Sequence, residues 1–297
     1  MNRLFEKLFL TRSYFTIALR PRANLDIITE PTFLPAFIRP ATADRWSADP
    51  ILAEEDGKTW LFYEAVQNNH GHIEVAEVLP DASLGRPTVL LKDDCHYSYP
   101  FVFQWKGNWY MIPESSAARE IRLYRAEHFP TQWALQEVLL LERAVDTTVF
   151  AIEGRLYLLT FLTDGASERV TPRAYTLELR ASGAVLIPVP WPEYDGLLVR
   201  GAGPLFGEGG CVYRPAQRNQ AQRYGDGVVF FRLQQTKDAY RETPAGVLNV
   251  PTGKKSGLYL DGAHTYCRSS QFEAIDLRCR EFDLLKLPRR LLSRLRK

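Results

Sequence analysis

The chain has 297 residues, of which 45% are hydrophobic and 12% aromatic, a composition that excludes disorder over most of its length. Its 37 basic and 35 acidic residues give a net charge of +2, so no nucleic-acid partner is expected. The four cysteines form no CxxC pair and are expected to be reduced thiols.

The first ten residues carry no targeting signal that we recognise. They have an apolar side, but Glu6 and Lys7 interrupt it, and no small-residue cleavage site follows. No stretch of the chain approaches the roughly eighteen apolar residues that a spanning helix needs. We therefore expect a cytoplasmic protein.

The first strand is expected at residues 14–19 and ends at Arg20-Pro21. Many ring-shaped β-proteins complete their last sheet with a strand from the opposite terminus, which removes an open edge. Residues 14–19 are therefore predicted to close a ring with the C-terminal part of the chain.

A unit of about fifty residues then recurs along the chain. It begins at Asp49-Pro50, turns at Gly57 and continues into an aromatic strand at residues 59–64. Later copies begin at three further points: Tyr99-Pro100, Asp146-Thr147 and, more faintly, Gly203-Pro204. Hairpin signals inside a repeat of this length are typical of a β-propeller blade.

A less regular unit is expected to open a fifth blade near residues 257–266. We therefore predict an all-β fold, a five-bladed β-propeller over residues 1–277, followed by a basic amphipathic tail over residues 278–297. Four or six blades are the alternatives that the spacing leaves open.

The tail interleaves eight basic residues with leucines. Such a segment is suited to an anionic membrane surface, which would place the protein peripherally at the inner membrane face. A solvated terminal helix is the alternative.

The repeat also predicts which side chains share a ring, because the innermost strands of a propeller line its central channel. The residues at the repeat position are Asp49, Tyr99, Asp146 and Gly203, and His264 is expected to join them from blade five. Two carboxylates and a histidine around one axis suit glycosyl transfer, which stabilises an oxocarbenium-like transition state. The alternative is that each aspartate caps a turn.

Glu64 and Glu114 share a second repeat position, at the end of an apolar strand. Glu114 precedes a small polar turn that would place its carboxylate at the channel mouth with a raised pKa, so we assign it a catalytic role beside Asp49 and Asp146. Glu64 is assigned to substrate binding, and a structural role shared by both glutamates is the alternative.

Five further residues are candidates for ligand binding. They are two arginines and a glutamine, together with two residues of the predicted ring around the channel: Arg200, Arg214, Gln217, His264 and Tyr99. Arginine pairs with phosphate or carboxylate through two hydrogen bonds, so an anionic ligand is expected. A surface salt bridge is the alternative for each arginine. Trp46, Tyr97 and Tyr224 offer flat faces for sugar rings, although core packing explains them equally well.

No metal or cofactor is predicted. His70, His72 and His96 lack a compact Asp or Cys partner motif, and the chain contains no phosphate-binding glycine loop and no nucleophile elbow.

Several separated motifs together resemble a known family. They are Ser47-Ala48-Asp49-Pro50, Gly71-His72-Ile73, Ser98-Tyr99-Pro100-Phe101, Ile112-Pro113-Glu114-Ser115, Val145-Asp146-Thr147-Thr148, Tyr213-Arg214-Pro215-Ala216-Gln217 and Gly262-Ala263-His264-Thr265-Tyr266. They resemble the propeller domain at the N-terminus of plant glucosamine inositolphosphorylceramide transferases. Bacterial proteins similar to that domain stand alone or accompany sugar formyltransferase-like domains among surface-polysaccharide genes.

The fold more distantly resembles the five-bladed propellers of arabinanases, levansucrases and invertases. That resemblance implies catalytic or supporting roles for Asp49 and Asp146. The arabinanase-like glycosidases commonly carry their acid in a Glu-Gly-Pro motif, and here the matching triplet is Ala202-Gly203-Pro204. The acid is absent from that place, which argues against an ordinary glycosidase unless Glu114 or Glu64 has taken the role.

The leading hypothesis is a glycosyltransferase of cell-surface polysaccharide or glycolipid biosynthesis, with a sugar donor and a glycan or glycolipid acceptor as partners. A glycoside hydrolase with Glu114 as its acid is the second hypothesis. A non-catalytic carbohydrate-binding adaptor is the third.

Overall fold

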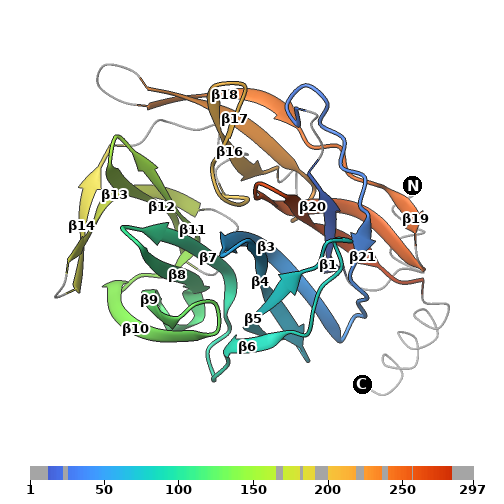
Figure 1. The fold of residues 1–297 in the computed structure, drawn as a ribbon, viewed down its shortest axis with the longest axis horizontal. Coiled ribbons are helices and arrows are strands. Elements are labelled where there is room, and N and C mark those ends of the chain that lie inside the picture. Colours follow the sequence, from blue (N-terminus) through green and yellow to red (C-terminus); the bar gives the residue numbers. More distant parts are fainter. Residues whose placement is uncertain are drawn as a thin grey trace, which may run out of the picture.

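The computed structural model describes residues 13–22, 26–164, 170–180, 183–190, 200–218, 224–235, 240–255 and 257–282. Within these ranges the strands form five antiparallel sheets that surround a common centre (Figure 1). The structure therefore confirms the predicted five-bladed β-propeller.

Each of the first four blades is a four-stranded meander that starts at the channel and runs outward. Blade one contains β3 (Arg45–Glu55), β4 (Lys58–Gln67), β5 (His70–Val78) and β6 (Thr88–Leu91). Blade two contains β7 (Ser98–Trp105), β8 (Asn108–Ser115), β9 (Glu120–His128) and β10 (Gln132–Leu140), with the short 3-10 helix η1 (Ser116–Ala118) after β8. Blade three contains β11 (Ala144–Ile152), β12 (Arg155–Thr163), β13 (Val170–Arg180) and β14 (Gly183–Val189). Blade four contains β15 (Phe206–Glu208), β16 (Cys211–Gln217), β17 (Val228–Gln235) and β18 (Tyr240–Val247).

Blade five joins the two ends of the chain. It contains β19 (Gly253–Lys255), β20 (Leu258–Arg268), β21 (Phe272–Arg280), β1 (Tyr14–Pro21) and β2 (Phe37–Ile38), in that order across the sheet. β1 pairs antiparallel with β21 along its whole length, from Tyr14 opposite Cys279 to Pro21 opposite Phe272. The predicted closure by residues 14–19 is therefore confirmed.

The boundary expected after residue 277 falls inside β21, which continues to Arg280. Arg278 is buried in this strand, and its Nε donates to Asp261 Oδ1 over 2.6 Å. Residues 283–297 of the expected tail lie outside the described residues, so membrane attachment through them stays a prediction. Among the described residues no helix is long and apolar enough to cross a membrane.

The inner hairpins of blades one to three turn on two consecutive residues with positive φ. These pairs are Asp56-Gly57, Lys106-Gly107 and Glu153-Gly154. A two-residue turn with φ above zero at both positions matches the twist of the paired strands. The repeated glycine of the sequence unit thus marks the turn that sets the register of each inner hairpin.

The inner strands also share a bulge, and it sits at the ring position of the repeat. The register of β3, β7 and β11 shifts around Asp49, Tyr99 and Asp146, whose φ angles are 53°, 41° and 50°. A positive φ is costly for a residue with a Cβ, so each bulge needs compensating contacts. The equivalent shift in β20 lies at His264-Thr265.

Hydrogen bonds between blades supply these contacts. The backbone N–H of Asp49 donates to Asp276 Oδ2 over 3.1 Å, and that of Tyr99 donates to Asp49 Oδ2 over 3.1 Å. The N–H of Asp146 donates to Glu114 Oε2 over 3.3 Å. Each bulge is therefore fastened to a carboxylate of the preceding blade.

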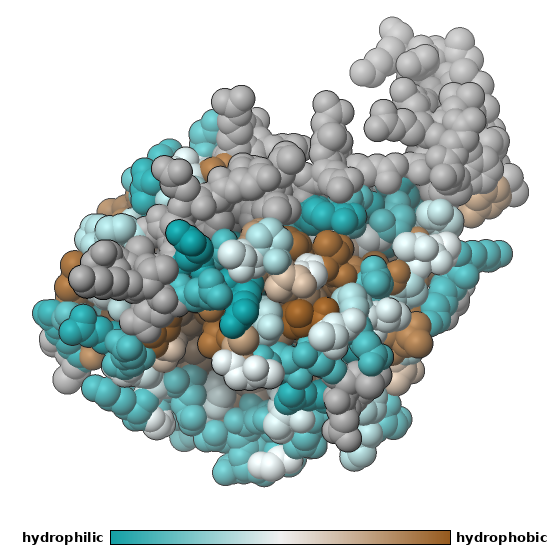
Figure 2. Space-filling view, turned by 90° about the horizontal axis from the view of Figure 1, so that it is seen from above, coloured by the Kyte–Doolittle hydropathy of each residue, from teal (hydrophilic) through white to brown (hydrophobic). Residues whose placement is uncertain are grey.

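The hydrophobic core is divided between groups of blades. One buried cluster spans blades one to three, and another joins blades four and five with β1. Large hydrophobic side chains that remain exposed include Val212 and Tyr224. Hydrophobic residues also gather among hydrophilic ones on the side of the molecule that is turned upward in Figure 1 (Figure 2).

The hydroxyl of Tyr99 ties blade two to blades three and four. It accepts the backbone N–H of Gly203 over 2.8 Å and lies 3.1 Å from Thr148 Oγ1. We expect Tyr99→Phe to lower the free energy of unfolding by about 1–3 kcal/mol, because it leaves the buried Gly203 N–H without an acceptor. Urea unfolding would measure the loss.

The matched control is Tyr110→Phe, since no hydrogen bond of the Tyr110 hydroxyl is found among the described residues. Equal stability losses in the two variants would contradict the assigned role of the Tyr99 hydroxyl.

Candidate functional site

The bulges direct polar side chains into a cavity of about 310 Å³ at one end of the channel. Its lining comes from β1, blades one to three, blade five and the segments that precede β15 and β17. The lining residues are Phe15, Trp46, Ala48, Asp49, Glu64, His96, Ser98, Glu114, Val145, Asp146, Arg200, Tyr224 and His264. The structure thus brings together all three predicted catalytic carboxylates, together with Glu64, Arg200 and His264. We call this cavity the carboxylate pocket.

Asp49 lies in a buried chain of charged groups. The His264 ring stands between two carboxylates, with Nε2 3.3 Å from Asp49 Oδ1 and Nδ1 2.5 Å from Asp276 Oδ2. Thr265 Oγ1 also donates to Asp49 Oδ1, over 3.0 Å. Asp276 was not among the predicted site residues, because it lies on β21, outside the repeat positions from which the site was predicted.

Burial and neighbouring charges set the pKa values of Asp49, His264 and Asp276. Burial raises the pKa of Asp49 to about 8, against the opposing effect of His264. Burial alone would lower the pKa of His264, but Asp276 and Asp49 raise it to about 9. The His264 charge and backbone N–H donors hold the pKa of Asp276 below its usual value despite burial. His264 is therefore a buried cation at neutral pH.

Asp146 is held by a two-point ion pair. Arg200 Nε lies 2.5 Å from Asp146 Oδ2, and Arg200 Nη2 lies 3.1 Å from Oδ1. Gln217 Nε2 donates to the same Oδ2 over 3.3 Å and to the Gly201 carbonyl over 3.0 Å. Arg200 and Gln217 thus position Asp146, and both were predicted as ligand-binding residues.

Glu114 has a different environment from Asp146. Ser116 Oγ donates to Glu114 Oε1 over 3.0 Å, and no ion-pair partner of Glu114 is found in the described part of the chain. Burial and the negative charge of Asp146 raise the pKa of Glu114 to about 7, against the attraction of Arg200. A carboxyl group that titrates near neutral pH is suited to proton transfer.

Glu64 forms a pair with His96 on the blade-one side of the pocket. The two side chains meet at 3.0 Å between His96 Nε2 and Glu64 Oε1, and the Gly71 N–H donates to His96 Nδ1 over 3.0 Å. Because His96 Nδ1 accepts this hydrogen bond, the neutral His96 ring carries its proton on Nε2, which faces Glu64. A Cβ on residue 71 would lie 2.5 Å from Glu64 Oε1, so the pair needs glycine there.

His96 was considered from the sequence only as a metal ligand and not as a pocket residue. Its hydrogen bond to Glu64 raises its pKa, against the opposing effect of burial. The one sequence signal that could have identified the pair is the Gly71-His72-Ile73 motif, whose glycine the pair requires.

Aromatic side chains form another part of the wall. Trp46 and Tyr224 line the pocket as expected for sugar-binding faces, whereas Tyr97 instead hydrogen-bonds to Asp93 and lies outside it. Phe15 was missed by the sequence analysis. It comes from the closing strand β1 and stacks on the His264 ring at 4.2 Å between ring centroids. The strand that closes the ring therefore also completes the pocket.

Two predicted ligand-binding residues lie elsewhere. Arg214 is buried and forms a bidentate ion pair with Glu242, at 2.6 and 2.8 Å. Tyr99 is buried below the pocket, where its hydroxyl serves the contact between blades. Neither residue lines the carboxylate pocket. The expected anionic ligand thus loses one of its two proposed arginine partners, and Asp146 already occupies the other.

Three buried groups could be considered as metal ligands, because atoms of Asp49, His264 and Asp276 lie within 4.8 Å of one another. However, Asp276 already accepts backbone N–H groups from Asp49, His264 and Thr265. His264 also lies at hydrogen-bonding distance from both carboxylates. The three groups therefore hold one another in a buried ion-paired set.

Comparison with protein families confirms the resemblance inferred from the motifs. The family described as glucosamine inositolphosphorylceramide transferase 1, N-terminal, matches residues 28–274. A relative of that name from Oryza sativa subsp. indica is 33% identical over 221 residues, which cover 70% of this chain and 29% of the relative. The Arabidopsis thaliana relative is 29% identical over 229 residues, covering 72% and 29%. The chain thus spans less than a third of the length of these relatives.

Solved structures share the fold at low sequence identity. An α-L-arabinofuranosidase from Podospora anserina in complex with cellotriose gives a TM-score of 0.56 at 11% identity, covering 79% of this chain and 90% of its own. A Bombyx mori β-fructofuranosidase gives 0.54 at 14%, covering 72% and 53%. An α-L-arabinofuranosidase from Lactobacillus brevis gives 0.51 at 15%, covering 75% and 79%. The expected likeness to the five-bladed propellers is confirmed at the level of the fold.

The buried set of Asp49, His264 and Asp276 predicts how the stability of the protein depends on pH. The native pKa values of Asp49 and His264 lie above those of the unfolded chain, so the native state holds an extra proton on Asp49 between about pH 4 and 8 and on His264 between about pH 6.5 and 9. The stability due to His264 is fully present below about pH 6.5 and is lost as the pH rises through 9. We expect the melting temperature to fall across this interval, as measured by calorimetry.

The variant His264→Gln should show a shallower fall, because it removes one of the titrating groups. A fall as steep as that of the unsubstituted protein would contradict the assignment of His264 as a buried cation.

Proposed function

The chain belongs to the family of N-terminal domains of glucosamine inositolphosphorylceramide transferases, and we propose that it transfers a sugar unit to a glycan or glycolipid acceptor. The observation that carries the proposal is the carboxylate pocket, in which Glu114 titrates near pH 7 beside the ion-paired Asp146. A volume of about 310 Å³ lies in the range of small-ligand sites.

The charges of the pocket favour a sugar that carries a protonated amine. Four carboxylates line it, from Asp49, Glu64, Glu114 and Asp146. Arg200 is committed to Asp146, His96 pairs with Glu64, and His264 pairs with Asp49, which leaves Glu114 as the carboxyl group without a basic partner in the described lining. The surplus negative charge is what raises the pKa of Glu114 beyond the effect of burial. An ammonium group would replace the proton on Glu114, and the glucosamine in the names of the relatives fits this chemistry.

The proposed chemistry uses Glu114 as the general acid. Its proton passes to the oxygen of the leaving group as the bond from that oxygen to the anomeric carbon breaks. Asp146 and, once it has lost its proton beside His264, Asp49 face the positive charge that develops on the sugar ring. An acceptor hydroxyl then forms the new glycosidic bond, and its proton passes to the carboxylate that the first step left on Glu114. Ala202 is fully buried and has no acidic group, so it offers no alternative acid at the place where the related glycosidases carry theirs.

Hydrolysis is the second candidate. The same acid and the same carboxylates would serve if water, rather than an acceptor hydroxyl, attacked the anomeric carbon. Incubation with a glycan panel and no activated donor separates the two, since release of free sugar favours hydrolysis. A binding adaptor without chemistry would instead keep its cellular function after Asp49→Asn and Asp146→Asn.

Binding of an amino sugar should depend on pH. We expect the affinity for glucosamine to be at least about ten-fold higher than the affinity for glucose or N-acetylglucosamine, because glucosamine alone supplies a cation for the Glu114 carboxylate. Its affinity should increase as the pH rises through about 7, where Glu114 ionises, until the amine loses its own proton. Calorimetry in buffers of different ionisation enthalpy would measure the affinity and the protons released. Equal affinities for the three sugars would contradict the amine preference.

Loss of the acid should abolish transfer without unfolding the protein. We expect Glu114→Gln to reduce the rate of sugar transfer from nucleotide-activated sugars by about 100-fold or more, the usual contribution of general acid catalysis. Product can be followed by mass spectrometry. Glu127→Gln, at an exposed position of β9, is the matched control and should retain the full rate. An active Glu114→Gln variant would exclude Glu114 as the acid.

A further inference from the structure

A second cavity lies at the other end of the channel and shares no lining residue with the carboxylate pocket. On β7, Ser98 lines the carboxylate pocket, whereas residues 101–103 line the second cavity. On β11 the same division separates Asp146 from residues 149–152. At about 3.3 Å per strand residue, the two cavities are distinct sites on the same strands.

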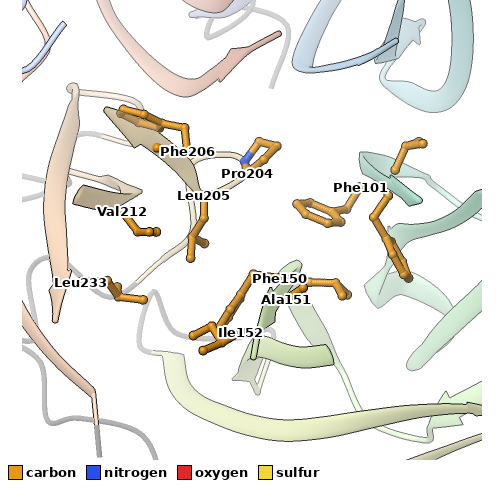
Figure 3. Close-up of a pocket in the computed structure, with 13 residues that line it drawn as sticks. Phe101, Phe150, Ala151, Ile152, Pro204, Leu205, Phe206, Val212 and Leu233 are labelled. Atoms are coloured by element: carbon orange, nitrogen blue, oxygen red, sulfur yellow. The ribbon is translucent and has the colours of Figure 1, made fainter. Parts of the chain in front are cut away.

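The second cavity is lined entirely by hydrophobic residues and glycine. It has a volume of about 430 Å³ and lies between blades two, three and four. Phe101, Phe150 and Leu205 point toward the common space (Figure 3). No charged side chain lines it, so the side chains of the lining offer a potential ligand apolar contact. We call it the apolar cavity.

Blade four differs from the other blades next to this cavity. Its inner strand β15 has three residues, and residues 200–202 continue along β16 beyond a wide bulge, where Gly201 pairs with Ala216 and the Gln217 N–H donates to the Arg200 carbonyl. The bulge passes through Gly203-Pro204 and brings Pro204 and Leu205 into the lining of the cavity. Leu205 packs there against the small cluster of blade three.

The rim of the apolar cavity carries a net positive charge on one side. Gly207 and Val212 line both this cavity and an adjoining shallow pocket that contains Arg22 and Glu208. Glu208 forms an ion pair with Arg268, and Arg22 Nη2 lies 3.7 Å from the same Glu208 oxygen. Two guanidinium groups therefore share one carboxylate, and Arg22 is the more exposed of the two arginines.

We propose that the apolar cavity binds the alkyl chain of a single-chain anionic amphiphile, whose head group lies at the rim beside Arg22. The apolar lining matches the chain, and the net positive rim matches the head. This site does not depend on the function proposed for the carboxylate pocket.

The test uses the full chain and alkyl carboxylates of eight to sixteen carbons, each below its micellar concentration, with calorimetry as the readout. Affinity should increase about four-fold for each added methylene while the chain still fits, and then level off once the cavity is full. Alkyltrimethylammonium compounds of equal length should bind more weakly, because their head is repelled by the rim.

Two variants at exposed positions of the lining test the location: Ala151→Trp and Val212→Trp. Each places an indole at the cavity and should reduce affinity about ten-fold or more. Leu135→Trp, on the outer strand β10, is the matched control and should bind normally. Arg22→Gln should weaken carboxylate binding about two- to five-fold, the range of an exposed ion pair.

Three outcomes would overturn the proposal. One is an absence of saturable binding by any alkyl carboxylate. Another is an affinity that rises with chain length without levelling off and is unchanged by both tryptophan variants, which would place the amphiphile on the outer surface. The third is equal affinity for cationic and anionic heads, which would remove the role of Arg22.

Discussion

The structure depends on one recurring interaction, the hydrogen bond from the backbone N–H of a bulged inner-strand residue to a carboxylate of the preceding blade. Asp276, Asp49 and Glu114 each accept such a bond. Because the bulge residues adopt positive φ, the interaction compensates for local strain while it fastens neighbouring blades together. It also fixes buried carboxylates at the end of the channel. The features that hold the ring together are thus the same ones that give the carboxylate pocket its chemistry.

Crowding of these carboxylates gives each one a different state. Asp146 is neutralised by Arg200, and Asp276 by His264, whereas Glu114 is left with the residual repulsion of Asp146. The acidic residues of the ring therefore differ in their partners through contacts that the repeat does not contain. This division separates an ion-paired carboxylate from a carboxyl group that can donate a proton, as acid catalysis at a sugar requires.

The sequence predicted the blades and much of the ring, because both follow from a local pattern: a glycine turn, an aromatic strand and an Asp or Tyr at the bulge. It placed Asp49, Asp146 and Glu114 in one pocket for the same reason. It could not anticipate the partner of Arg214, because Glu242 lies 28 residues away on a different strand of the blade. Phe15, Asp276 and the pairing of His96 with Glu64 were missed by the sequence analysis. Each depends on a contact between segments that no repeat in the sequence relates. The end of β21 at Arg280 was obscured by the basic residues it shares with the tail, although Arg278 is buried in an ion pair.

The irregular fourth blade connects the two ends of the channel. Gly203 adopts a φ of 123°, and a Cβ there would clash with the Tyr266 carbonyl, so the chain passes close against blade five at this point. The neighbouring Ala202 is buried and accepts the N–H of Tyr266 through its carbonyl. The segment therefore serves as a backbone contact at the place where the resemblance to arabinanase-like glycosidases would put an acid. The bulge that follows brings Pro204 and Leu205 into the lining of the apolar cavity. One departure from the repeat thus borders both proposed sites: it leaves the acid role to Glu114 in the proposed mechanism, and it lines the space in which an amphiphile is proposed to bind.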